Sequence, residues 1–162
     1  MKVLYLTDSS RFNYHKNLVA DFTEVIPGDV YDMSDGKPLG ERYYEIEGAK
    51  PDVIITFDLA GHVLRTGSDT LSLNNVYARM AHILFQNTDR YGADLRARQN
   101  LSMFTYIPEG SDVAAARCKY AEVPNILEFV PVERNPQTDE QHEKNREMIK
   151  IWWDEYKKEA ML

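Results

Sequence analysis

Two short apolar runs constrain the fold more than any other feature of this sequence. Lys2–Thr7 and Val53–Phe57 are almost continuously apolar. A strand with one solvent-facing side alternates apolar and polar residues, whereas a strand buried on both faces has an unbroken apolar pattern. Helices covering both faces of a parallel sheet produce that burial. The two runs therefore predict a parallel sheet within an α/β domain.

The segments around these runs alternate between helical and strand patterns. Leu18, Phe22 and Ile26, for example, recur at helical spacing. Strand and helix patterns in alternation predict a three-layer, mostly parallel α/β sheet, flavodoxin-like or Rossmann-like, with helices on both faces. Further strands are predicted at Asp29–Met33, His82–Phe85, Leu101–Ile107 and Ile126–Val130, and helices at Asn13–Ile26, Leu39–Lys50, Leu73–Met80 and Asp112–Tyr120.

Two segments of the middle of the chain leave room for alternatives. His82–Phe85 could extend the preceding helix, but Gln86–Asp89 ends the apolar run abruptly and favours a strand. His62–Leu73 is polar, contains glycine and has no clear period, so we expect a loop there. Such loops often carry function.

A long helix is predicted at the end of the chain. Thr138 and Gln141 have the spacing of a capping box, which marks a helix N-terminus. We expect Trp152 to face the core and Trp153 to be partly exposed. Residues 1–137 are expected to form the α/β domain, and 138–162 to pack on it as its C-terminal helix, giving a single domain. The residues predicted to share one face are Met148, Ile151, Trp152 and Tyr156.

Charge and cysteine content exclude several classes of protein. The formal net charge of −7 argues against general nucleic-acid binding and against docking on an anionic membrane, because both need a basic surface. Cys118 is the single cysteine, so an intrachain disulfide is excluded and a reducing compartment is favoured. No apolar run approaches the length of a membrane span. We therefore expect a cytoplasmic protein.

Candidate site residues follow from where strands end. In open parallel sheets, ligands bind beyond the carboxyl ends of the strands. Hydroxyls, amides, a histidine and arginines in such loops could recognise hydroxyls, carboxylates or phosphates. In the alternative interpretation these side chains have only structural roles, because they cap helices or pair with surface acids. The candidate ligand-binding residues are Asp8, Ser9, Ser10, Arg11, His62, Arg65, Asn74, Asn75, Arg79, Gly110 and Ser111.

Asp8 and Asp58 are the candidates for catalysis. Each follows one of the two buried apolar runs. Two carboxylates at neighbouring strand ends could bind Mg²⁺ or act as acid and base. Receiver domains have a similar constellation, but they open with an acidic pair, whereas serines follow Asp8 here. Capping of the turn after each strand is an equally good interpretation.

Several cofactor sites lack their sequence signatures. The chain has no G-x-G-x-x-G, so the usual NAD fingerprint is missing, and no G-x-x-x-x-G-K-[ST], so a P-loop nucleotide site is missing too. It has no G-x-S-x-G nucleophile elbow. The four histidines and Cys118 show no zinc-ligand spacing, so we expect no zinc. The sequence leaves Mg²⁺ as a candidate cofactor.

The order of strands resembles the N-terminal Rossmann-like half of GT-B-fold glycosyltransferases of the spore-maturation type. The segments that carry the resemblance are Lys2–Asp8, Pro51–Asp58, Ala81–Asn87 and Ile126–Pro131. In that family a second, C-terminal domain holds the nucleotide-sugar donor, and here we expect only one helix after residue 137. The resemblance thus implies an acceptor-side or nucleotide-like site without self-sufficient catalysis.

Three functions remain as expectations. The first is a module that binds a small anionic ligand, nucleotide-like or sugar-nucleotide-like. The second is a small, glycosyltransferase-like transferase or a hydrolase that uses Asp8 or Asp58. The third is a protein-interaction subunit, with a homodimer contact through the C-terminal helix; an exposed apolar strip along Met148–Tyr156 would favour it.

Overall fold

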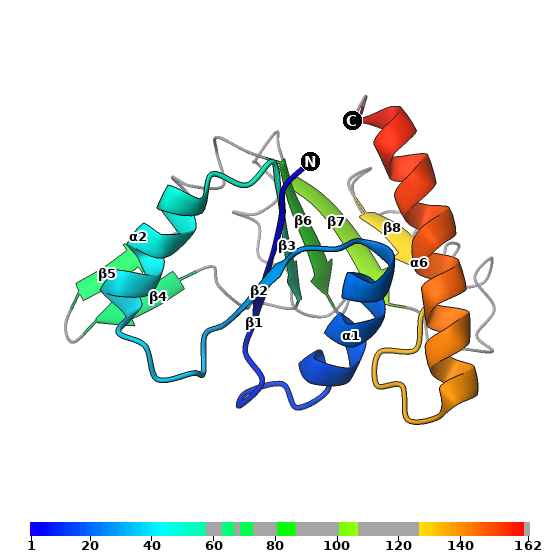
Figure 1. The fold of residues 1–162 in the computed structure, drawn as a ribbon, viewed down its shortest axis with the longest axis horizontal. Helices are drawn as coiled ribbons and strands as arrows, with labels where there is room; N and C mark the ends of the chain where they lie inside the picture. Colours follow the sequence, from blue (N-terminus) through cyan, green and yellow to red (C-terminus); the bar gives the residue numbers. More distant parts are fainter. Residues whose placement is uncertain (58–62, 67–68, 73–80, 87–100, 107–126, 161–162) are drawn as a thin grey trace.

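The computed structural model describes residues 1–57, 63–66, 69–72, 81–86, 101–106 and 127–160 (Figure 1). Its centre is a six-stranded sheet in which every neighbouring pair of strands is parallel. The strand order is β2-β1-β3-β6-β7-β8. The strands are β1 (Val3–Thr7), β2 (Asp29–Asp32), β3 (Val53–Phe57), β6 (Ala81–Gln86), β7 (Leu101–Tyr106) and β8 (Leu127–Val130).

These strands confirm the predicted α/β fold with a parallel sheet. The segment predicted at His82–Phe85 is a strand and not a helical extension, because β6 pairs with β3 from Ala81 to Phe85. The unbroken apolar runs are buried on both sides, since all five residues of β1 and all five of β3 are buried. This is the burial that a pattern without alternation predicts.

The helices contribute to two separate hydrophobic core clusters. Val3 and Tyr5 of β1 belong to one core cluster, together with residues of α1 (His15–Val25) and α6 (Asp139–Glu159). Leu4 and Leu6 belong to a second cluster, with Ile46 of α2 (Leu39–Ala49). Figure 1 shows α1 and α6 side by side and α2 apart from them. Successive residues of a strand point to opposite faces, so β1 supplies both clusters.

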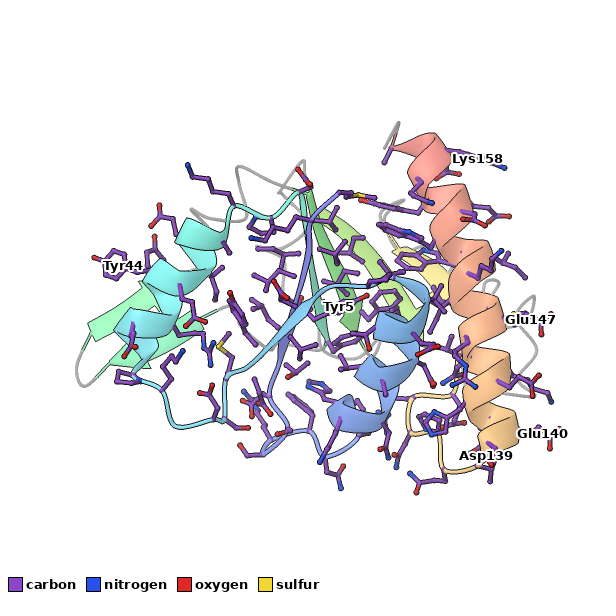
Figure 2. All side chains as sticks on the ribbon, in the orientation of Figure 1. Tyr5, Tyr44, Asp139, Glu140, Glu147 and Lys158 are labelled. Carbon is purple, nitrogen blue, oxygen red and sulfur yellow. The ribbon has the colours of Figure 1, made fainter. Side chains whose placement is uncertain are left out.

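An aromatic cluster joins α1, the sheet and α6. The ring of Phe22 lies 5.1 Å from that of Phe57, 4.8 Å from that of Phe85 and 6.3 Å from that of Trp152, measured between centroids. Tyr5 lies in the same core (Figure 2) and donates a hydrogen bond from its hydroxyl to the carbonyl of Ile26, at 2.6 Å. Burial raises the pKa of Tyr5 above its ordinary value, so its hydroxyl remains a donor.

The loop predicted at His62–Leu73 is wrong for most of its length. Val63–Thr66 forms β4 and Asp69–Ser72 forms β5, and the two strands pair antiparallel from Val63↔Ser72 to Thr66↔Asp69. The sequence does contain a signal for a hairpin, the dipeptide Gly67-Ser68, which is typical of a tight hairpin connection. Polar residues within short strands hid the pattern. This hairpin lies against α2.

The structure confirms the predicted start of the C-terminal helix but only part of the face that the sequence predicts. Thr138 and Gln141 form the reciprocal hydrogen bonds of a capping box. Trp153, expected to be partly exposed, is only 6% exposed, whereas Ile151, expected on the buried face, is 49% exposed. At 3.6 residues per turn, Asn145, Ile149, Trp152 and Trp153 share one stripe, and Ile151 lies outside it.

The charged residues in the first and last turns of α6 match the helix dipole. Asp139 and Glu140 lie in its first turn, and Lys157 and Lys158 lie in its last turn. Figure 2 shows Asp139, Glu140 and Lys158 pointing away from the body of the protein. Acidic residues at the N-terminus and basic residues at the C-terminus stabilise a helix.

Two predicted helices, Leu73–Met80 and Asp112–Tyr120, lie outside the described residues. Among the helices that the structure describes, none is both long enough and apolar enough to pass through a lipid bilayer.

Candidate functional site

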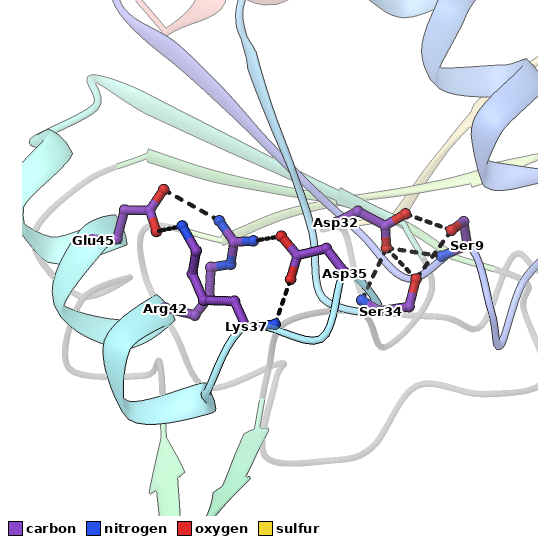
Figure 3. Close-up of polar contacts among 7 residues, drawn as sticks. All are labelled: Ser9, Asp32, Ser34, Asp35, Lys37, Arg42 and Glu45. Atoms are coloured by element: carbon purple, nitrogen blue, oxygen red, sulfur yellow. Dashed lines mark hydrogen bonds and ion pairs between the residues drawn. The ribbon is translucent and has the colours of Figure 1, made fainter.

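The loops that follow β1 and β2 meet at the carboxyl end of the sheet (Figure 3). The amide of Met33 donates to the carbonyl of Thr7 at 2.7 Å, so the segment after β2 stays paired with β1 for one residue beyond β2. Asp8 and Ser9 follow β1, and Asp32 ends β2. Because the strands are parallel neighbours, their loops emerge at the same edge.

The turn after β1 is organised by Asp8. Its Oδ1 accepts hydrogen bonds from the amide of Arg11 (3.1 Å) and from the hydroxyl of Ser10 (3.0 Å). The amide of Asp8 donates to Nδ1 of His15 at 3.1 Å. His15 is fully buried on α1. Since its Nδ1 accepts, that nitrogen carries no proton, and the imidazole anchors the start of the turn.

Asp32 gathers four hydrogen bonds from two serines. Its Oδ1 accepts from the amides of Ser9 (3.2 Å) and Ser34 (3.0 Å) and from the hydroxyl of Ser34 (2.6 Å). Its Oδ2 accepts from the hydroxyl of Ser9. The two serine Oγ atoms lie 3.0 Å apart. We call Ser9, Asp32 and Ser34 the Asp32 cluster; it ties the two loops together.

The surroundings of Asp32 lower the pKa of its carboxyl group to about 2. Partial burial acts in the opposite direction and raises the pKa, but the hydrogen bonds from Ser34 and Ser9 outweigh it. Hydrogen bonds to the charged form of a carboxylate favour that form. Asp32 is therefore ionised at neutral pH and acts as an acceptor.

A second network holds the loop after β2 against α2. Arg42 of α2 is only 3% exposed, and its guanidinium lies 4.9 Å from the ring centroid of Tyr31. It forms ion pairs with Asp35 and with Glu45, the latter at 3.2 Å. Lys37 also pairs with Glu45, at 2.7 Å. Figure 3 shows this chain of charges running from the loop to the helix.

These contacts shift the pKa of two members of the network. A hydrogen bond from the amide of Lys37 lowers the pKa of Asp35, and the Arg42 guanidinium adds to the effect. A hydrogen bond to Glu45 raises the pKa of Lys37. Both shifts favour the charged forms of Asp35 and Lys37, and the ion pairs place Asp35 and Glu45 against Arg42 and Lys37.

The structure brings together only part of the predicted site. Ser9 joins the Asp32 cluster, and Asp8 and Ser10 form the adjoining turn, whereas Arg11 is exposed with its guanidinium 5.3 Å from the ring centroid of Phe12. Arg65 lies in β4, on the hairpin against α2. The predicted residues outside the described part of the chain are Asp58, His62, Asn74, Asn75, Arg79, Gly110 and Ser111.

Sequence reasoning missed Asp32, Ser34 and the Arg42 network. A signal was present, because Asp32 and Ser34 lie at the end of the strand predicted at Asp29–Met33, as Asp8 and Ser9 lie at the end of the first predicted strand. His15 was missed because a single histidine in a helix carries no pattern. Within the described residues, no group of three or more His, Cys, Asp or Glu side chains is arranged to hold a metal ion.

No protein-family model matches the chain, and no curated protein matches it at a significant level.

Proposed function

We propose that this protein binds a small polar ligand, nucleotide-like or sugar-nucleotide-like, at the carboxyl end of β1 and β2. One observation carries the proposal: the two strand-end loops converge in a cluster of hydrogen-bonding side chains. Ligands of open parallel sheets bind at this edge. The proposal keeps the binding role expected from the sequence and moves its centre to Asp32.

The strand order supports the Asp8 turn, at the carboxyl end of β1, as part of the site. The order β2-β1-β3-β6-β7 corresponds to that of flavodoxin-like sheets, with β8 added at one edge. We infer from it the full three-layer arrangement of such folds. From β1 the chain passes to β2 on one side and later to β3 on the other, so the switch point lies between β1 and β3. The Asp8 turn follows β1 at that point.

The anchoring of the two loops by buried side chains also supports a binding role. His15 of α1 anchors the Asp8 turn by accepting a hydrogen bond from the amide of Asp8. Arg42 of α2 anchors the loop after β2 through its ion pair with Asp35. Both anchoring side chains are buried. A site whose groups are already held in place loses less conformational entropy when a ligand binds.

Asp32 suits binding better than proton transfer. A general acid or base works best when its pKa lies near the working pH. The pKa of Asp32 is about 2, far below neutrality. We therefore propose that Asp32 accepts hydrogen bonds from a ligand and does not exchange a proton with it.

The alternative of an interaction subunit has less support. An exposed apolar strip along Met148–Tyr156 would favour it, but Ile149, Trp152 and Trp153 are buried in the core. Ile151 is the exposed large apolar residue of α6 between Asp139 and Glu159.

A thermal-shift screen tests the proposed function. The purified protein is heated with nucleotides, sugar nucleotides and sugar phosphates, with and without Mg²⁺. A ligand at about 100 times its Kd stabilises a protein by roughly 2.7 kcal/mol, which raises Tm by several degrees. We expect at least one compound to do so.

Two variants and a control localise such a hit. Asp8→Asn keeps an oxygen for the turn and removes the charge, and Arg65→Ala tests the hairpin. Asp154→Asn, on the exposed side of α6, is the matched control. Loss of the shift in Asp8→Asn and its retention in Asp154→Asn supports the site. No shift with any compound would overturn the proposed function.

A further inference from the structure

The Asp32 cluster is rich in acceptors and short of hydrogens. Each serine hydroxyl has one hydrogen. The hydroxyl hydrogens of Ser9 and Ser34 both serve the carboxylate of Asp32. Yet the two Oγ atoms are 3.0 Å apart, a distance at which one of them should donate to the other. Ionised Asp32 brings no hydrogen of its own, so the three contacts share two hydrogens.

Free acceptor capacity remains on three oxygens. A carboxylate has about four lone-pair sites, two on each oxygen. Oδ1 of Asp32 receives three hydrogen bonds, whereas Oδ2 receives one, from the hydroxyl of Ser9. Each serine Oγ also has lone pairs that its own donation leaves unused. One donated hydrogen would complete the three contacts, and the unused lone pairs of the serine Oγ atoms can accept a second.

The charges around the cluster disfavour an anionic group at this point. Asp32 itself is negative, and in the described structure it is held by the hydrogen bonds of serines and not by a cation. The neighbouring cations Lys37 and Arg42 are engaged by Asp35 and Glu45. An added phosphate would meet the charge of Asp32, and both Lys37 and Arg42 already have carboxylate partners. Neutral donors fit better.

We propose that the Asp32 cluster binds a vicinal diol of a sugar ring, with its two hydroxyls donating to Oδ2 of Asp32 and to a serine Oγ. This inference rests on the proposed function and names the part of the ligand that the site recognises. It also changes the sequence-based expectation, because recognition at this point is through hydroxyls and not through negative charge. The diol could belong to a ribose or to a hexose.

Pairs of probes that differ by one hydroxyl test this inference. Binding is followed by the amide NMR signals of Ser9 and Ser34. One pair is a ribonucleoside 5′-monophosphate and its 2′-deoxy counterpart; the other is a hexose 1-phosphate and its 2-deoxy counterpart. A hydrogen bond to a charged acceptor contributes enough that the deoxy probe should bind about tenfold more weakly or worse. The pair that responds identifies ribose or hexose.

Variants of the Asp32 cluster distinguish loss of the diol contact from loss of the folded structure. Asp32→Asn should weaken the hydroxylated probe about tenfold and weaken the deoxy probe much less. Ser34→Ala keeps the carboxylate and serves if Asp32→Asn does not fold. Asp29→Asn, at the other end of β2 and exposed, is the matched control. Circular dichroism establishes that each variant is folded.

The outcomes distinguish this inference from the proposed function. Equal binding of hydroxylated and deoxy probes, or signals that move only away from Ser9 and Ser34, would overturn the diol site and leave the binding module standing. A compound from the thermal-shift screen that binds while neither probe pair does would have the same meaning. Silence in both experiments would overturn both.

Discussion

At the scale of single residues, two glycines have opposite surroundings. A Cβ on Gly28 would lie 2.5 Å from the carbonyl oxygen of Val3 and 3.0 Å from a ring carbon of Tyr5. A Cβ on Gly48, in α2, would have nothing within 4 Å. Gly28 therefore permits the close approach of the chain to β1 just before β2, whereas Gly48 only adds flexibility to a helix.

Replacing each glycine with alanine should have opposite effects. Gly28→Ala should lower the free energy of unfolding by about 1–3 kcal/mol, because backbone atoms must move apart. Gly48→Ala should raise it by up to about 1 kcal/mol, because alanine has the higher helix propensity. Urea unfolding monitored by circular dichroism measures both. A stable Gly28→Ala variant would contradict the close contact.

Asp32 should make stability depend on pH in the acid range. Its folded pKa, about 2, lies below the ordinary 3.8, so its contribution is present above pH 3.8 and is lost as the pH falls toward 2. One pKa unit corresponds to about 1.4 kcal/mol, and solvent around the partly exposed group reduces the effect to roughly 1 kcal/mol. We compare urea unfolding of the wild type and Asp32→Ala at about pH 5 and about pH 2.5. A constant difference between the two proteins would refute this prediction.

At the scale of elements, a buried polar contact attaches α6 to α1. Asp21 of α1 is 1% exposed; its carboxylate lies 2.8 Å from Nδ1 of His142 and accepts from Nδ2 of Asn145 at 3.2 Å. Asn145 also bonds the amide and the carbonyl of Glu133, at 2.7 and 2.9 Å. One asparagine thus fixes α6 to both α1 and the segment after β8.

Asp21 and Asn145 should be energetically coupled. Asp21→Ala should destabilise the protein by about 1–3 kcal/mol, because it leaves one N–H of the buried Asn145 amide without an acceptor and removes the partner of His142. Asn145→Ala should have a cost of the same order. Combined, the two changes should cost less than their sum, since the contact can be lost only once. Additive costs in a urea-unfolding double-mutant cycle would contradict the coupling; Asp154→Ala is the exposed control.

The elements were more predictable than the candidate site. The strands at Lys2–Thr7 and Val53–Phe57 followed from uninterrupted hydrophobicity, and the start of α6 followed from Thr138 and Gln141. The Asp32 cluster depends on β2 lying beside β1, which no local pattern reveals. Arg42 shows the same limit, because its burial arises from Tyr31 and Asp35 and not from its own neighbours in sequence.

At the scale of the whole molecule, Phe22 joins α1, the sheet and α6 in one core. Its ring contacts residues of β3, β6 and α6, and it is fully buried. The core on this face is therefore continuous from α1 through the sheet to the C-terminal helix. Cooperative unfolding of these parts is the expected result of a shared core.

Phe22→Ala should destabilise the whole protein and not one helix. Removing a buried phenylalanine ring costs about 3–5 kcal/mol, because it removes contacts and leaves a cavity. Differential scanning calorimetry should show one transition at a lower Tm. The exposed Tyr44→Ala is the matched aromatic control and should change stability by less than about 0.5 kcal/mol. Two separate transitions would show that α6 unfolds independently.

The position of the tryptophans gives the protein an internal optical reporter. The sequence has two tryptophans, and both lie buried on α6 against the aromatic core. Their fluorescence therefore reports how one helix is seated, without any added dye. A ligand at Ser9 and Asp32 should leave the emission maximum in place, whereas detachment of α6 should move it toward that of tryptophan in water. Binding and unfolding can then be followed separately in the same cuvette.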